Sequence, residues 1–301
     1  MKIIFKIALV VFMLRIAMPI SAYCQHEAPQ ATQQKESGGE QLDIIDKVVD
    51  HKEVDFYFFG KLHLPQFPPI KIGGITIDLS PTKSLFMMVL VSIILILVLL
   101  RAAHINTKNK VPKGIGNFVE VMIVFIRDDI VVPNLGKDGV RLLPLFLTMF
   151  FFILFANLFG LIPMMVQPTK NINVTGGLAL ITFFTMIGQG MKKNGVIGYW
   201  KGLAPPGVPV FVLPIMVVVE FIGLFTRPFA LLMRLFANMT AGTIIVLSLI
   251  GLIFIMSYAG IVIAIPFAIF IYCLEIFIAV LQAYIFTMLS SIFINLAIHQ
   301  H

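Results

Sequence analysis

Charged residues are scarce in this chain. They make up 12% of its 301 residues, hydrophobic residues make up 59%, and the mean hydropathy is +0.98. So few charges exclude an ordinary soluble domain and indicate a protein that crosses a membrane several times. The net charge of +7 does not indicate nucleic-acid binding, because most Lys and Arg residues lie in short loops beside apolar runs, as they do in oriented membrane proteins.

Cysteines are scarce too, and the motifs of soluble enzymes are missing. Cys24 and Cys273 lie in very different segments, which leaves no framework for disulfides or a metal. The sequence has no Gly-rich phosphate loop, no metal-spaced His/Cys cluster and no nucleophile elbow. We therefore expect no cofactor, no resident metal and no catalytic nucleotide site.

The first 80 residues divide into a signal peptide and an extension outside the cytoplasm. Residues 1–25 have a basic start, an apolar core and a small-residue exit, and they are too short for an uncleaved membrane helix. Residues 26–80 begin as a polar linker, with a short amphipathic helix expected at 42–54. The alternation around a Gly-Gly pair at 70–77 predicts a β-hairpin.

Residues 81–301 are expected to form an all-α polytopic membrane domain. Hydrophobic runs predict five membrane segments, at 84–100, 142–166, 174–191, 214–256 and 267–298. The loop at 101–141 is rich in Lys and Arg, which places this loop and the C-terminus in the cytoplasm and the N-terminal region outside. Apolar residues at helical spacing over 118–126 predict an interfacial helix on the membrane surface.

The fourth segment is longer than a bilayer requires. At 1.5 Å per residue, 214–256 would extend about 65 Å, against a hydrocarbon core of about 30 Å. It is either two spans with a buried turn or one strongly tilted helix. The second is favoured because no strong turn signal interrupts it, and Pro228 can kink a helix without ending it. A turn at 257–266 then leads into the fifth segment, which completes a long antiparallel hairpin.

A permanent charge lies inside the fourth segment, at Arg234. A charge within a membrane helix costs roughly 3 kcal/mol on insertion scales, and a guanidinium stays protonated at any physiological pH. Arg227 and Glu220 precede Arg234 by seven and fourteen residues, about two and four helical turns, so the three share one face. Asn238 follows on this face one turn later.

Glu275 and Gln282, which are also seven residues apart, form a second polar stripe on the returning segment. Arg234 can pair with Glu220 or Glu275 simply to lock the bundle, since polar groups often join membrane helices. Alternatively, a carboxylate that moves toward and away from a fixed arginine would load and unload protons. The chain has the arginine but no mobile carboxylate of its own, which indicates a partner.

Two strings of residues carry a resemblance to a known family. Arg-Leu-Phe-Ala-Asn-Met-Thr-Ala-Gly at 234–242 and Leu-Gln-Ala-Tyr-Ile-Phe at 281–286 resemble subunit a of the bacterial F-type ATP synthase, the stator of its membrane sector. The likeness covers roughly residues 80–298. It implies a tilted hairpin that clasps a rotating c-subunit ring, whose carboxylates carry protons between two half-channels and so couple proton flow to ATP synthesis.

The resemblance also implies roles for individual residues. Arg234 matches the essential arginine that faces the ring carboxylate and blocks a direct leak between the half-channels. Gln282 matches the glutamine that faces this arginine. Asn238 and Glu275 match positions of the inlet half-channel, and Glu220 matches the acid of the outlet half-channel.

Two titratable inlet positions of the family are absent. Thr243 stands where many members carry His or Glu, and Gly160 stands where some bacterial members carry an acid. The inlet is then expected to depend on Glu275, with Thr243, Asn238 and bound water relaying protons.

The implied partners are the c-subunit ring, the b-subunit peripheral stalk, other ATP synthase subunits, membrane lipid and translocated protons, with no nucleic acid. The implied location is the bacterial cell inner membrane. Two other functions stay open. One is a secondary transporter that binds an anionic solute at Arg234, although such folds usually show internal repeats and none is found between the halves. The other is a purely structural membrane anchor.

Overall fold

The protein is described by a computed structural model over residues 53–56, 60–63, 70–72, 75–77, 82–108, 114–162, 165–203 and 211–299. The expected signal peptide lies outside these residues. Strands β1 (Glu53–Phe56) and β2 (Gly60–His63) pair antiparallel, and so do β3 (Ile70–Ile72) and β4 (Ile75–Ile77). The β3–β4 hairpin lies where the alternating pattern predicts one. The end of the helix expected at 42–54 instead lies in β1.

Five helical segments of the described residues are long and apolar enough to cross a membrane, which confirms an all-α polytopic fold. They lie in α3 (Lys83–Lys108), α6 (Leu143–Gly160), α7 (Ile172–Asn194) and the two limbs of α9 (Leu213–Ile298), which span Leu213–Val246 and Ile265–Ile298. Helix α6 stops at Gly160 rather than at residue 166. Glycine is a weak helix former, and Pro163 disfavours helical geometry in the residue before it.

A chain of short helices joins α3 to α6. It comprises α4 (Ile115–Phe125), the π-helix η2 (Ile126–Val131), α5 (Val132–Leu135) and the 3₁₀-helix η3 (Lys137–Leu142). Phe118 and Val121 of α4 are exposed, whereas Ile126 and Ile130 at its C-terminal side are fully buried. The helix predicted near 118–126 is present, and its apolar exposed side leaves it suited to lie against lipid.

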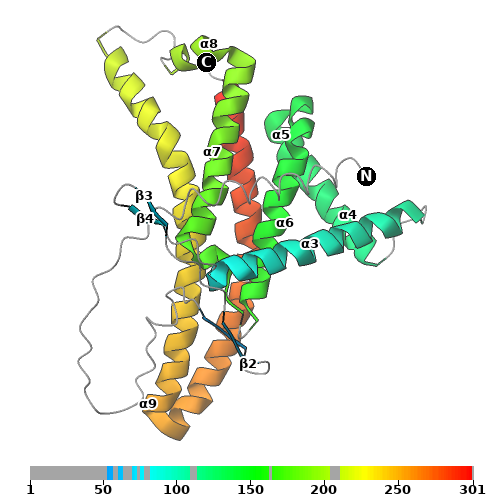
Figure 1. Ribbon diagram of the computed structural model, residues 1–301, viewed down its shortest axis with the longest axis vertical. Coiled ribbons are helices and arrows are strands. Elements are labelled where there is room, and N and C mark those ends of the chain that lie inside the picture. Colours follow the sequence, from blue (N-terminus) through cyan, green and yellow to red (C-terminus); the bar gives the residue numbers. More distant parts are fainter. Residues whose placement is uncertain are drawn as a thin grey trace.

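Helix α9 reverses its direction, so that its two limbs form an antiparallel hairpin (Figure 1). Pro228 lies inside the first limb without ending it, as expected for one long helix. This limb has 34 residues and so extends about 51 Å, well beyond a hydrocarbon core of about 30 Å, and it must tilt to stay within the membrane. Helix α3 packs on α6 and runs across it at a steep angle (Figure 1).

The core lies where α6 and α7 pack on the second limb of α9. Phe146 and Phe150 of α6, Leu178 of α7 and Phe286 of α9 are all 1% exposed or less. The most apolar stretch of α6 is 72% buried within the protein, but the corresponding stretch of the first α9 limb is only 11% buried. The first limb therefore presents most of its surface to lipid or to another chain.

Candidate functional site

The polar stripe on the first limb begins with an ion pair. Arg227 Nη2 donates to Glu220 Oε1 at 2.7 Å, and the two side chains are 22% and 42% exposed. This contact confirms that residues seven apart share a face of this limb. Glu220 is thus neutralised by Arg227 rather than by Arg234.

Arg234, the central residue of the stripe, has no such partner. Its side chain is exposed, and among the described residues it forms no ion pair with Glu220, Glu275 or any other acid. Within the part of the chain that the structure describes, this arginine therefore does not lock the bundle by a salt bridge. Its charge is available to a group outside the described residues.

Asn238 and Gln282 join the two limbs of α9. Asn238 Nδ2 donates to Gln282 Oε1 at 3.0 Å, one helical turn beyond Arg234. Gln282 is 1% exposed, and its Nε2 has no acceptor among the described residues. Two of the residues singled out on separate stripes of the sequence are thus in direct contact. The open Nε2 donor would be satisfied by a water molecule or by an incoming carboxylate.

Glu275 lies further toward the tip of the hairpin, against Gly242 of the first limb. A Cβ built on Gly242 would overlap Oε1 of the Glu275 carboxylate. Glycine at the end of the arginine string therefore lets the acid of one limb approach the backbone of the other.

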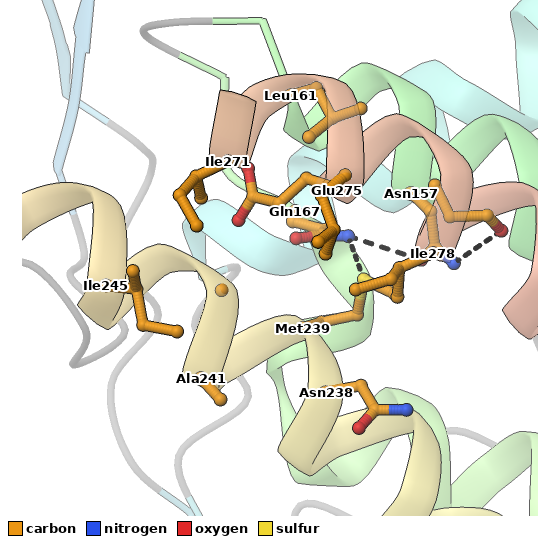
Figure 2. Close-up of a pocket in the computed structure, with 13 residues that line it drawn as sticks. Asn157, Leu161, Gln167, Asn238, Met239, Ala241, Ile245, Ile271, Glu275 and Ile278 are labelled. Carbon is orange, nitrogen blue, oxygen red and sulfur yellow. Dashed lines mark hydrogen bonds between the residues drawn. The ribbon is translucent and has the colours of Figure 1, made fainter. Parts of the chain in front are cut away.

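A pocket of about 170 Å³ surrounds this acid, with room for several water molecules (Figure 2). Glu275 and Gln167 point into it, and Asn238 lies at its edge. Most of the remaining lining is apolar and comes from the residue after α6 and from both α9 limbs: Leu161, Met239, Ala241, Ile245, Ile271, Leu274, Ile278 and Ala279. The pocket can hold water beside a carboxylate while excluding lipid-sized groups.

Asn157 fixes one wall of the pocket. Its Oδ1 accepts hydrogen bonds from Thr169 Oγ1 at 2.7 Å and from Gln167 Nε2 at 3.3 Å, and its Nδ2 donates to the Ala279 carbonyl at 3.5 Å. All three side chains are at most 4% exposed. Gln167 and Thr169 were not predicted, although a polar Gln-Pro-Thr directly after an apolar run is a signal for them.

The structure gives physical reasons for the two departures from the family pattern. A Cβ on Gly160 would overlap the side chain of Gln167, so the space that an acid would need is taken by this amide. Thr243 donates its hydroxyl to the Met239 carbonyl at 3.1 Å and does not line the pocket. Neither position supplies a titratable group to the water beside Glu275.

A lysine supplies positive charge near the pocket. Lys170 ends the 3₁₀-helix η4 (Pro168–Lys170), directly after Thr169. Burial lowers the pKa of Lys170 to about 8, and the negative charge of Glu275 acts in the opposite direction. Lys170 is not among the residues that the sequence patterns single out.

The charges of the Glu220–Arg227 pair act on Tyr199. It belongs to α8 (Val196–Lys201), is fully buried, and packs its ring where a Cβ on Gly190 would stand. Burial raises the pKa of its phenol, with opposing effects from the charges of Arg227 and Glu220. Its hydroxyl is a buried polar atom with no hydrogen-bond partner among the described residues.

Comparisons with known proteins agree on one family. Residues 85–295 match the ATP synthase A chain family. The chain is 46% identical to ATP synthase subunit a of Chloroherpeton thalassium, over 86% of this chain and 77% of that protein. It is 44% identical to ATP synthase subunit a 2 of Prosthecochloris aestuarii, over 93% of this chain and 85% of that protein. With identity of this degree over most of its length, the chain belongs to the ATP synthase A chain family.

Proposed function

We propose that this chain is the proton-conducting stator subunit of the F-type ATP synthase membrane sector. The observation that carries the proposal is the exposed Arg234, which has no ion-pair partner among the described residues. It lies beside the Asn238–Gln282 bond, on the limb that the other described helices leave largely uncovered. A rotating c-subunit ring would cover this limb, and each ring carboxylate would reach Arg234 as the ring turns. The b-subunit peripheral stalk and other ATP synthase subunits would complete the assembly.

The electrostatic logic follows from the permanence of the arginine charge. A guanidinium in a low-dielectric interface strongly favours the ionised form of a carboxylate that approaches it. A ring carboxylate would therefore give up its proton on reaching Arg234 and regain one after leaving it. The same charge repels a free proton, so it would block direct flow between two half-channels on either side.

Two polar sites flank Arg234 along the first limb. Glu220 with Arg227 lies toward its start, and Gly242 with the Glu275 pocket lies toward the hairpin tip. At 1.5 Å per residue these sites are about 33 Å apart along the helix axis, so they lie at well-separated places on the limb. We assign the Glu275 pocket with Asn238 to the inlet and Glu220 to the outlet.

The distribution of basic residues supports this orientation. The Lys- and Arg-rich stretch at 101–141 is expected in the cytoplasm, so α6 would run from the cytoplasm to its outer end near Asn157 and Gly160. The pocket then lies on the outer side, and the C-terminus lies in the cytoplasm of a bacterial cell whose inner membrane holds the complex.

An anion transporter that uses Arg234 fits the geometry less well. A solute in the Glu275 pocket would not contact Arg234, because this residue is not part of the lining. The carboxylate in the pocket would also repel an anion.

The test compares Arg234→Ala with Arg101→Ala, an exposed arginine of α3, in the complete ATP synthase reconstituted in liposomes. We expect Arg234→Ala to abolish ATP-driven proton pumping while Arg101→Ala pumps normally. Normal pumping by Arg234→Ala would overturn the proposal. The amount of each variant in the purified complex shows that assembly is intact.

A further inference from the structure

The proposed inlet has one carboxylate among its lining residues, Glu275, and the helix η4, which packs on α9, ends at a second ionisable side chain, Lys170. The turn that carries Lys170 is held firmly in place. Thr169 is 0% exposed and bonded to Asn157, and the Lys170 amide donates to the Gln167 carbonyl at 3.1 Å. Gln167 itself lines the pocket, so the turn that carries Lys170 begins at the wall of the space that Glu275 faces.

Lys170 and Glu275 interact electrostatically without forming a direct ion pair. Each charge acts on the other, yet no salt bridge within 4.0 Å joins these two described residues. The pocket between the limbs provides room for water beside the carboxylate. A water molecule between an ammonium and a carboxylate is the arrangement through which a proton passes from one to the other.

The other elements packed on η4 bring little charge of their own. Helix η4 contacts α3, α6, α7 and α9. Helix α6 has no ionisable side chain, and those of α7 are confined to its far end. Helix α3 begins at Lys83 and carries its other ionisable groups near its C-terminal end. Glu275 of α9 is the charge whose field acts on Lys170.

We propose that Lys170 is the second ionisable group of the inlet and relays protons between the outer solution and Glu275. This inference rests on the proposed function. An external hydronium gives its proton to the neutral Lys170 amine, leaving water and an ammonium. The ammonium passes a proton through the intervening water to the Glu275 carboxylate, which leaves a neutral amine and a carboxylic acid. Lys170 thus supplies a titratable group that Gly160 and Thr243 do not.

The proton affinity of Lys170 suits this exchange. A pKa of about 8 leaves a minority of the side chains in the amine form near neutral pH, so both partners of the exchange are present. An exposed lysine, with a pKa near 10.4, would hold its proton too tightly to relay it at the same rate.

The test measures passive proton conductance through the reconstituted membrane sector between pH 6 and pH 9.5. Equal pH on both sides and a fixed K⁺ diffusion potential keep the driving force constant across the series. Three variants are compared with the unaltered protein: Lys170→Gln, Lys170→Arg and Lys193→Gln. The last removes an exposed lysine at the far end of α7 and serves as the matched control.

We expect the unaltered protein and Lys193→Gln to show a change of conductance centred near pH 8. Lys170→Gln and Lys170→Arg should both lose this feature and conduct roughly 100-fold less at pH 7, because glutamine cannot carry a proton and arginine cannot release one. Normal conductance in Lys170→Arg would overturn the relay, since charge alone would then suffice. Persistence of the pH 8 feature in either Lys170 variant would overturn it as well.

The two proposals fail in different ways. If the chain is not a proton conductor, the unaltered protein will show no conductance at any pH. If only the relay is wrong, the unaltered protein will conduct and Lys170→Arg will match it. Because Lys170→Arg keeps a long cationic side chain, it serves as the folded variant even if Lys170→Gln assembles poorly.

Discussion

The carboxylate of Glu275 packs against the backbone of Gly242 on the opposite limb of the α9 hairpin, so closely that a Cβ at residue 242 would overlap it. Gly242 ends the string that begins at Arg234. This string therefore keeps two residues of the proposed mechanism at a fixed separation on one helix. Arg234 is the cation that would face the ring, and Gly242 is the residue against which the proposed inlet acid packs. A rigid helical spacing between them keeps the pocket from drifting relative to the arginine.

Gly242→Ala is expected to impair proton flow by displacing Glu275. Forcing a methyl group into a packed site costs about 1–3 kcal/mol, and the acid side chain must turn away from the first limb. Gly188→Ala is the control, because a Cβ at residue 188 of α7 meets no atom within 4 Å. Proton pumping and the melting temperature of the purified complex are measured for both. Normal pumping by Gly242→Ala would show that the position of Glu275 does not matter.

Glu275→Gln is expected to remove the inlet acid while keeping its shape. An amide cannot take up and release a proton at physiological pH, so passive conductance should fall by roughly 100-fold or more. Glu120→Gln changes an exposed acid of α4 in the same way and should conduct normally. The readout is proton flux into vesicles that contain the assembled membrane sector. Equal flux in the two variants would favour a structural anchor over a conducting subunit.

Thr169→Val is expected to destabilise the turn that carries Lys170. It removes the 2.7 Å hydrogen bond to Asn157 from a fully buried site, with an expected loss of about 1–3 kcal/mol of stability. Thr185→Val, whose hydroxyl bonds only to its own helix at the Ile181 carbonyl, should lose less. Thermal unfolding of the complex compares the two. A smaller loss in Thr169→Val than in Thr185→Val would contradict this role of the Asn157 network.

Helical periodicity explains what could be predicted from the sequence. Hydrophobic runs located the five spans, and the seven-residue spacing placed Glu220 and Arg227 on one face, where they form an ion pair. Periodicity cannot decide which of the two arginines on that face forms the ion pair with Glu220. Only the packed structure shows that Arg227 does so and that Arg234 is left unpaired within the described chain.

Contacts between distant segments explain what could not be predicted. Lys170 and Glu275 are brought together by the packing of η4 on α9, and no local pattern encodes that approach. The same holds for Gln167, which reaches both Asn157 and Met239 across helix boundaries. Gly160 looked like a missing acid in the sequence, whereas the structure shows that its lack of a side chain makes room for Gln167.

The central claim is that Arg234 separates two half-channels that communicate only through a moving ring. The direct measurement is passive proton flux through the reconstituted membrane sector with the c ring cross-linked to this chain so that it cannot turn. The unaltered protein should pass no protons in this state, and Arg234→Ala should leak, because the electrostatic barrier between inlet and outlet is gone. Absence of proton flux through the cross-linked Arg234→Ala membrane sector would contradict the account. Proton flux through the cross-linked unaltered protein would contradict it as well.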